Sequence, residues 1–178
     1  MPTYVAFLRA INLGAKRKFP KEAIWAATEA AGGLEVETYI NTGNVRLTHP
    51  SRSVAKVQRE LEAAYAEAAG FEVPTVVFTV AELAALVARG EELHAEHDPA
   101  GQHYVTLFAT PPSAAAVHAV QDLAHPGETV VIEGRAAYVL LDGHIHTSRL
   151  LSAKQFNALG RGTARTIKVL RTLDEKWC

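Results

Sequence analysis

A chain of 178 residues is long enough for one ordinary domain, or for two small ones that need each other to form a core. With 48% hydrophobic and 21% charged residues, its composition excludes a disordered chain. The formal net charge of −1 gives no overall attraction to nucleic acid or to a membrane.

Targeting and membrane signals are weak. Arg9 interrupts the early apolar run of residues 4–8, so no secretory signal is predicted. The longest apolar stretch, residues 74–88, is broken by Glu82 and is too short to span a bilayer. The one cysteine, Cys178, excludes an intramolecular disulfide and favours a reducing compartment. We therefore expect a cytoplasmic protein without membrane contact.

The first half of the chain predicts the element order β-α-β-β-α-β. Residues 2–8 are rich in β-branched and aromatic side chains, which indicates a buried strand, and the polar residues 12–18 indicate a loop. Pro20 is typical of a helix start, and that helix is expected to end at Gly32 and Gly33. The next elements are a hairpin of residues 36–40 and 45–48 around the turn 41–44, a helix from its cap Ser53 to Gly70, and a strand at 74–78. This order is the split βαβ, or ferredoxin-like, arrangement.

The second half predicts a weaker echo of the same order. Residues 79–82 form a capping box that opens a short helix to about Arg89, and residues 91–102 are expected to be irregular. The following elements are a strand at 104–108, a helix at 111–123, a hairpin of 129–132 and 137–141, a second capping box at 152–155 and a helix at 163–175. We predict an α+β protein of two ferredoxin-like (βαββαβ-type) halves in tandem, with mixed or antiparallel sheets and helices packed on one face. The N-terminal subdomain is residues 1–80, and residues 81–178 form a βαββ core plus C-terminal helices.

Two blocks of the N-terminal third resemble a known family. Residues 4–14 read YVAFLRAINLG, and residues 38–45 read TYINTGNV. They resemble the domain of unknown function 1697 (DUF1697) family, whose usual pattern is roughly LRGINVGG…K followed by TYIQSGNVVF. Ala10 and Ala15 stand at usual glycines.

Residues 163–165 also resemble the start of that family's T-x-R-N-W-x-T motif. Thr166, Ile167 and Lys168 stand where Asn, Trp and a polar residue are usual. The resemblance implies a two-part α+β fold and a bacterial-type cytosolic protein. It implies no activity, because the family has no established one.

Basic residues gather in two segments. Residues 9–21 carry five basic residues and no acidic one, and residues 149–178 carry seven against two. Arginine offers a fork of donors to phosphate or carboxylate, lysine a point charge, and glycine exposes backbone N–H groups. We predict that a small anionic ligand, phosphate-bearing or nucleotide-like, binds in a basic groove between the subdomains, lined by residues 9–18, 41–44 and 163–171. The predicted ligand-binding residues are Arg9, Asn12, Gly14, Lys16, Lys18, Thr42, Gly43, Asn44, Thr163 and Arg165.

Other interpretations of the same residues stay open. All of these residue types are also ordinary in loops, hairpins and solvated surfaces. An enzyme on a phosphorylated or nucleotide substrate would use Arg9 and Arg165 as electrostatic stabilisers. A nucleic-acid-binding module would use strand aromatics, which the predicted strands supply as Tyr4, Tyr39, Tyr104 and Tyr138, although no RNA-recognition signature is present. A protein–protein module is the third alternative, and both a monomer and a homodimer are compatible with the sequence.

The sequence predicts no metal site and no cofactor. Neither a P-loop nor a dinucleotide fingerprint is present, and the histidines have no recognised zinc spacing. The histidines considered are His94, His97 and His103 in the irregular stretch, and His144 and His146, which a strand would place on one face. Ser148 and Ser152 have no nucleophile-elbow context, and Cys178 is terminal. Glu133 and Asp142 flank a hairpin and are the one carboxylate pair that could face each other.

Overall fold

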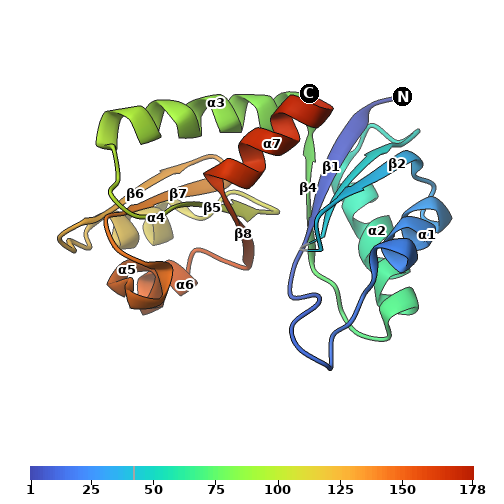
Figure 1. Ribbon diagram of the computed structural model, residues 1–178, viewed down its shortest axis with the longest axis horizontal. Helices are drawn as coiled ribbons and strands as arrows, with labels where there is room; N and C mark the ends of the chain where they lie inside the picture. The colour runs from blue at the N-terminus through green and yellow to red at the C-terminus, as the bar shows by residue number, and fades with distance from the viewer. Residues whose placement is uncertain (42) are drawn as a thin grey trace. The chain divides into compact units, whose positions relative to one another are not determined.

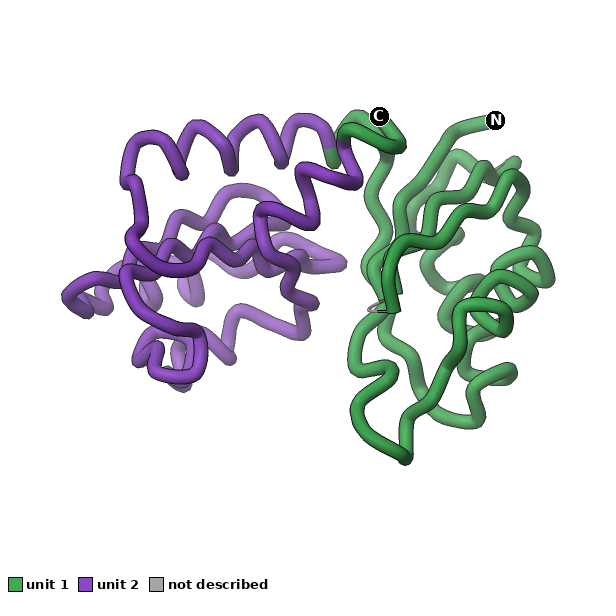
Figure 2. Tube along the Cα trace, viewed as in Figure 1, with its two compact units in different colours: residues 1–83, 175–178 green, residues 84–174 purple. Residues whose placement is uncertain are grey.

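The computed structural model describes residues 1–41 and 43–178, which form two compact units. Unit 1 comprises residues 1–83 and 175–178, and unit 2 comprises residues 84–174 (Figure 2). Each unit contains a four-stranded antiparallel sheet, with the strand order β2-β3-β1-β4 in unit 1 and β6-β7-β5-β8 in unit 2. The two orders are equivalent when the strands of each unit are counted along the chain. The predicted fold class, α+β with two ferredoxin-like halves, is confirmed.

Unit 1 has the predicted element order (Figure 1). Its elements are β1 (Thr3–Leu8), α1 (Lys21–Ala30), β2 (Leu34–Tyr39), β3 (Asn44–Thr48), α2 (Val54–Ala69) and β4 (Thr75–Thr79). Strand β1 lies inside the sheet because residues 4–8 are buried on both faces of the strand. Tyr4, Ala6 and Leu8 face the core that α1 and α2 cover.

Helix α2 follows the sequence signals at both of its ends. The Ser53 hydroxyl accepts a hydrogen bond from the Lys56 N–H at 3.3 Å, and Gly70 ends the helix with a φ of 77°. Between them, a stripe of residues four apart, Val57, Leu61 and Tyr65, is fully buried against the sheet. Both predicted boundaries of this helix are confirmed.

The last residues of the chain belong to unit 1. The Trp177 indole donates a hydrogen bond to Glu37 at 3.2 Å, and the Lys176 ammonium lies 5.6 Å from the centre of the Tyr39 ring. Glu37 and Tyr39 lie on the sheet face opposite α1 and α2, since they are in register with Arg46 and Asn44 rather than with the core-facing Val45. Residues 175–178 therefore add to the second face of the first sheet.

Unit 2 has helices on both faces of its sheet (Figure 1). Its elements are β5 (His103–Phe108), α4 (Ala114–Gln121), β6 (Glu128–Glu133), β7 (Ala136–Leu141), the 3-10 turn η1 (Ile145–Thr147), α5 (Arg149–Ser152), α6 (Lys154–Asn157) and β8 (Gly162–Thr166), flanked by α3 (Val80–His97) and α7 (Ile167–Trp177). One face of β7, with Ala137 and Val139, packs against α4 to α6. On the other face, the Tyr138 hydroxyl donates a hydrogen bond to the Leu86 carbonyl of α3 at 3.1 Å. The predicted one-sided packing describes unit 1, whereas unit 2 has a second helical layer.

Two predicted boundaries in the second half are wrong. Helix α3 continues through Gly90 to His97, so most of the stretch expected to be irregular is helical. Gly90 does not end the helix; a Cβ on it would lie 2.6 Å from the Ile167 Cδ1, so it is where α7 approaches α3 closely. The expected helix at 163–175 begins only at Ile167, because residues 162–166 pair with β5 as a strand.

Two predictions from local motifs are also wrong. Ser152 does not cap a helix; its hydroxyl donates to the carbonyls of Ser148 and Arg149, and it is Ser148 that caps α5. His144 and His146 do not lie on a strand, because His144 precedes the 3-10 turn and the two rings stack 4.8 Å apart. Among the described residues, no helix is long and apolar enough to cross a membrane.

Candidate functional site

Unit 1 contains a hollow of about 580 Å³ between the loop that follows β1 and the start of α1. We call it the α1 hollow; its lining residues are Asn12, Gly14, Lys18, Pro20, Lys21, Glu22 and Asn41. A volume of this size is within the usual range for small-molecule sites. Three of the predicted binding residues, Asn12, Gly14 and Lys18, line it.

Asn12 builds the wall of the α1 hollow. Its side-chain amide donates to the carbonyls of Phe19, at 3.2 Å, and Asn41, at 2.8 Å, and its Oδ1 accepts from the Phe19 N–H at 2.9 Å. These bonds join the loop after β1 to the turn between β2 and β3. Asn12 therefore acts mainly as a brace.

The basic run of residues 16–18 separates into two roles. Arg17 is held by the protein: its Nε donates to the Ala10 carbonyl at 2.6 Å, its Nη2 donates to the Glu72 carbonyl at 2.8 Å, and its guanidinium lies 4.4 Å from the centre of the Phe71 ring. Lys16 and Lys18 are exposed. Among the described residues, neither ammonium group has a hydrogen-bond or ion-pair partner.

Arg9 lies at the end of β1 with an exposed side chain, and its backbone N–H donates to the Pro74 carbonyl at 2.9 Å. No described residue pairs with its guanidinium. Lys21, on the edge of the α1 hollow, lies 4.0 Å from Glu22, an exposed contact that is worth little in water. The loop after β1 and the first turn of α1 thus carry several solvated cations, of which Lys18 and Lys21 line the α1 hollow.

Helix α1 begins at the α1 hollow without a side-chain cap. Pro20 precedes the helix, and its carbonyl accepts from the N–H groups of Ala23 and Ile24. The N–H groups of Lys21 and Glu22 belong to the first turn, where a helix supplies no acceptor. Such a helix start favours an anion, through its open N–H groups and the helix dipole.

Gly43 and Asn44, two of the predicted turn residues, shape the hairpin next to the α1 hollow and do not line it. Gly43 has a φ of 81°, and a Cβ there would lie 2.7 Å from the Leu8 Cβ, so the turn passes very close to β1. Asn44 is fully buried in β3, and its amide donates to the Tyr39 carbonyl at 3.0 Å. Thr42 lies outside the described residues.

Thr163 and Arg165 lie in unit 2, on β8. Both are buried, and the Arg165 Nη1 donates to the Thr163 hydroxyl and to the Ala164 carbonyl, each at 2.9 Å. Burial lowers the pKa of Arg165 to about 10. The strand places these two side chains together, where a helix was expected.

Backbone strain gathers in the two segments that meet at Asn12. Ala10, Asn12 and Ile40 have φ angles of 57°, 54° and 50°, a region that is unfavourable for residues with a Cβ and most unfavourable for a β-branched one. Strained residues of this kind are frequent at binding sites. The DUF1697 pattern has glycine at the position of Ala10. The positive φ there gives a reason for that glycine, because glycine adopts this conformation without strain.

Three lining residues, Pro20, Lys21 and Glu22, lie outside the predicted site. In the sequence, Pro20 indicates only a helix start, Lys21 belongs to the basic run, and Glu22 carries no signal for an anion site. Asn41 lies in the turn predicted to line the groove but is not among the predicted ligand-binding residues. It joins the site through a bond to Asn12, 29 positions earlier in the chain, which no local pattern indicates.

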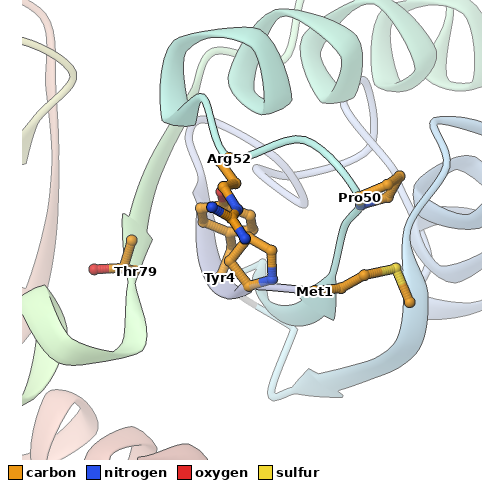
Figure 3. Close-up of a pocket in the computed structure, with 6 residues that line it drawn as sticks. Met1, Tyr4, Pro50, Arg52 and Thr79 are labelled. Carbon is orange, nitrogen blue, oxygen red and sulfur yellow. The ribbon is translucent and has the colours of Figure 1, made fainter.

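A second hollow, of about 540 Å³, lies elsewhere on unit 1 (Figure 3). Its lining residues are Met1, Pro2, Tyr4, Pro50, Arg52 and Thr79. The Tyr4 hydroxyl donates to the Ser51 carbonyl at 2.8 Å, and burial together with the Glu82 carboxylate raises its pKa. Glu82 also accepts hydrogen bonds from the Thr79 N–H and hydroxyl, which confirms the predicted capping box at the start of α3. This hollow offers a single cationic side chain, that of Arg52, against a mainly apolar lining, so it is the weaker anion site.

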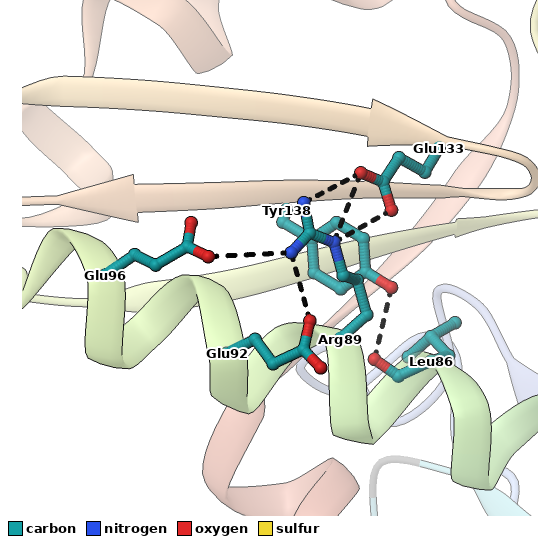
Figure 4. Close-up of polar contacts among 6 residues, drawn as sticks. All are labelled: Leu86, Arg89, Glu92, Glu96, Glu133 and Tyr138. Atoms are coloured by element: carbon teal, nitrogen blue, oxygen red, sulfur yellow. Dashed lines mark hydrogen bonds and ion pairs between the residues drawn. The ribbon is translucent and has the colours of Figure 1, made fainter.

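The polar groups of unit 2 are mainly committed to its own structure (Figure 4). The Arg89 guanidinium on α3 donates to both Glu133 carboxylate oxygens, at 3.0 to 3.2 Å, and to Glu92 at 3.1 Å. Glu133 and Asp142 do not face each other, because they lie at opposite ends of the β6–β7 hairpin. Asp142 instead accepts a hydrogen bond from the Ala100 N–H at 3.2 Å.

His94 and His103 form a pair of contacting histidines in unit 2. Their rings stack with centroids 5.4 Å apart, and their Nδ1 atoms are 3.3 Å apart. Burial, with a smaller contribution from His94, lowers the pKa of His103 to about 4. Within the described residues, no group of three potential ligands could hold a metal ion.

Comparison with known proteins gives a family and a fold. The profile of a family described as "Protein of unknown function (DUF1697)" matches residues 1–138. Among solved structures, the chain is similar to that of a conserved bacterial protein, SP0830 from Streptococcus pneumoniae, with a TM-score of 0.76 and 20% sequence identity over 99% of this chain and 98% of that one. No curated protein matches. At this identity, the likeness shows a shared fold.

Proposed function

The chain belongs to the DUF1697 family, and since that family has no known function, we propose one from the site itself: unit 1 binds a small anionic, phosphate-bearing ligand in the α1 hollow. The proposal concerns unit 1 alone. A contribution from Thr163 and Arg165, and binding in a groove between the subdomains, stay predictions.

The observation that supports this proposal most directly is the pairing of cations with an uncapped helix start. Lys18 and Lys21 line the same hollow into which α1 begins, and Pro20 supplies no side-chain acceptor for the first N–H groups. A phosphate offers several oxygens and at least one negative charge, so it can accept from both kinds of donor. Glu22 opposes an anion, and the neighbouring Lys21 offsets its charge in part.

The expected affinity is weak, because every group of the site is exposed to water. An exposed ion pair contributes about 1 kcal/mol or less. Two such contacts, from Lys18 and Lys21, and two hydrogen bonds of about 1 kcal/mol each, from the N–H groups of Lys21 and Glu22, correspond to a dissociation constant on the order of 1 mM. Added salt weakens this binding further, since exposed charges are screened.

A titration with inorganic pyrophosphate, followed by NMR of the backbone amides, tests the proposal. We expect the amide signals of residues 12–22 to shift, and the double variant Lys18→Ala/Lys21→Ala to weaken binding by about tenfold. The control Lys56→Ala/Lys154→Ala removes the same charge from exposed lysines outside the predicted site segments and should leave binding unchanged. Equal losses in the two double variants, or no shift in the wild type, would contradict the proposal.

The cellular location and the source of the protein are expected on grounds separate from its ligand. Cys178 is the one cysteine, and the family resemblance is to cytosolic bacterial proteins, so we expect a cytoplasmic, bacterial protein. Fractionation of cells that express the full chain checks the location. Nucleic-acid binding and the oligomeric state stay predictions.

A further inference from the structure

Each sheet has two edge strands, whose outer sides have no neighbouring strand: β2 and β4 in unit 1, and β6 and β8 in unit 2. An open edge offers a row of N–H and C=O groups that can pair with a strand of another chain. Folded proteins usually block such edges with bulges, charged side chains or covering segments. An edge without a block is therefore a surface on which a partner strand can dock.

The edges of β2 and β8 are interrupted. On β2, the register with β3 shifts between Leu34 and Glu37, and this irregularity breaks the row of backbone groups. On β8, the Arg165 guanidinium donates to the Ala164 carbonyl at 2.9 Å, so a charged side chain lies against the backbone of the strand. Neither strand offers an uninterrupted edge.

The edge of β4 is blocked at both of its ends. The Thr75 N–H donates to the Glu62 carboxylate at 2.9 Å, and the Thr79 N–H donates to the Glu82 carboxylate at 2.8 Å. Each carboxylate takes the place that a carbonyl of an added strand would occupy.

Strand β6 has a regular edge, because all six of its residues pair with β7 without a shift of register. In an antiparallel pair, every second residue bonds to the neighbouring strand, and the residues between point their N–H and C=O groups outward. The Asp142 N–H donates to the Gly127 carbonyl at 2.8 Å, which fixes this alternation. Residues 129, 131 and 133 therefore bond to β7, and residues 128, 130 and 132 face outward.

The outward groups of Val130 and Ile132 have no bonding partner in the described part of the chain. The Glu128 N–H is occupied, because it donates to the His125 carbonyl at 3.1 Å. Between its two glutamates the strand reads TVVI, in which every residue is β-branched and half-buried and none is charged. Such a segment favours strand pairing and lacks the charges that usually protect an edge.

We propose that the edge of β6 binds β6 of a second copy of this chain. The two strands pair antiparallel about a twofold axis at Val131, and the two four-stranded sheets join into one continuous sheet. The surface belongs to unit 2 alone, so the proposal does not depend on the ligand of the α1 hollow.

The backbone of β6 is complementary to itself in this register. Val130 lies opposite Ile132 of the second copy, and each of the two pairs so formed exchanges both of its N–H···O bonds. These are the residues whose outward groups are free. With the axis at Val130, the ladder would instead require the Glu128 N–H, which the His125 carbonyl already occupies.

The side chains of β6 also match in this register. Val131 lies opposite Val131 of the second copy, at a position where side chains of an antiparallel pair are closest. Thr129 lies opposite Glu133 of the second copy, so no two glutamates meet across the pair. This self-complementarity is the reason that the partner is a second copy of the chain.

Sedimentation equilibrium of the full chain tests the dimer. One strand pair is a small interface, so we expect a weak dimer, whose average mass rises toward that of two chains at about 100 μM. Val130→Pro removes an outward N–H without removing a bond to β7, and both copies then lose a hydrogen bond. This variant should weaken dimerisation by about 30-fold. Val130→Thr is the control, because it keeps the N–H and the branched shape and should leave the dimer in place.

Opposite charges at the twofold axis test the register. Val131→Lys and Val131→Glu each place like charges opposite each other, so each variant alone should dimerise about tenfold more weakly. An equimolar mixture of the two should restore the dimer, since lysine then lies opposite glutamate, and this rescue also shows that both variants fold. Leu34→Lys and Leu34→Glu are the controls on the edge strand β2, where Leu34 is exposed, and should dimerise as the wild type does.

A wild type that stays monomeric at about 100 μM would overturn the proposal, and the free edge would then have to serve another protein. A dimer that Val130→Pro leaves unchanged would also overturn it, because the interface would lie elsewhere. The same holds if the mixture of the two Val131 variants is no more dimeric than each alone, or if the Leu34 variants lose the dimer to the same extent.

Discussion

At the scale of single residues, two backbone positions show how the chain shapes the α1 hollow. Ala10 has a φ of 57°, and its carbonyl accepts from Arg17. Gly43 has a φ of 81° at the place where the hairpin turn passes β1. Glycine adopts a positive φ without strain, so Gly43 suits its conformation and Ala10 does not. We therefore expect a change to glycine at position 10 to stabilise the protein and a change from glycine at position 43 to destabilise it.

Ala10→Gly should stabilise the protein. A residue with a Cβ costs roughly 1–2 kcal/mol in the left-handed region, and glycine gives back about 0.5–1 kcal/mol through the greater entropy of the unfolded chain. We therefore expect a gain of up to about 1 kcal/mol in the free energy of unfolding, measured with urea. Ala15→Gly is the control, since Ala15 also stands at a usual glycine but has no positive φ. The explanation is wrong if both changes have the same effect.

Gly43→Ala should destabilise the protein more than Gly70→Ala. Both glycines have a positive φ, of 81° and 77°, so both substitutions introduce backbone strain of about 1–2 kcal/mol. A Cβ at Gly70 meets nothing within 4 Å, whereas one at Gly43 would lie 2.7 Å from the Leu8 Cβ and 2.9 Å from the Ile11 Cδ1. Overpacking of this kind adds about 1–3 kcal/mol. Urea unfolding of the two variants measures the difference, and equal losses would exclude the close approach.

At the scale of elements, similar local sequence patterns form different structures, depending on which distant residues pack against them. The capping boxes at 79–82 and 152–155 look alike, yet only the first caps a helix, because Ser148 already caps the short helix that contains Ser152. Gly70 ends α2, but Gly90 lies inside α3, where Ile167 and Tyr138 approach it. Local patterns therefore predicted most elements, and they failed where packing from a distant element decided the role of a residue.

The predicted site shows the same division. The loop after β1 and its lysines were found from charge alone, and Lys18 does line the α1 hollow. The role of Asn12 could not be predicted, since its bond to Asn41 depends on how the two segments fold together. Thr163 lies on a strand because residues 162–166 pair with the distant β5, and the helical stripe of the sequence begins only at Ile167. Charge can be read along a sequence, whereas a hollow is a property of the folded chain.

The contact between α3 and β5 predicts a loss of stability in acid. His103 has a pKa of about 4 in the folded protein, against about 6.5 when unfolded, mainly because it is buried and secondly because it stacks on His94. The unfolded state thus binds the proton more readily, so stability is complete above about pH 6.5 and falls as the pH is lowered toward 4. The loss approaches about 3 kcal/mol at the acid end.

Unfolding by urea between pH 7 and pH 4 measures this effect. His103→Phe should remove most of the fall in the free energy of unfolding between about pH 6.5 and pH 4. It also removes the contact with His94. His118→Gln is the control, because His118 is exposed on α4. If His118→Gln flattens the profile as much as His103→Phe, another group is responsible. Glu91 and Arg171 also act on His103, in opposite directions, and their mutual ion pair at 2.8 Å limits their net effect.

At the scale of the whole molecule, one topology is used twice. Both sheets have the same strand order, but the helices differ: unit 1 covers one face with α1 and α2, and unit 2 covers both faces. The α1 hollow belongs to unit 1 only, since all of its lining residues lie between Asn12 and Asn41. A shared topology therefore does not imply a shared site.

The return of residues 175–178 to unit 1 has a consequence for how the chain is made. A ribosome completes residues 1–83 first, and then adds about 90 residues of unit 2 before Trp177 exists to donate to Glu37. At about 5–20 residues per second, that interval lasts roughly 5–20 s. During it, the nascent first sheet lacks the contacts of Trp177 and Lys176 on its second face. The newly made protein thus passes through a period in which a chaperone could recognise that face, and this period closes when the last turn of α7 is synthesised.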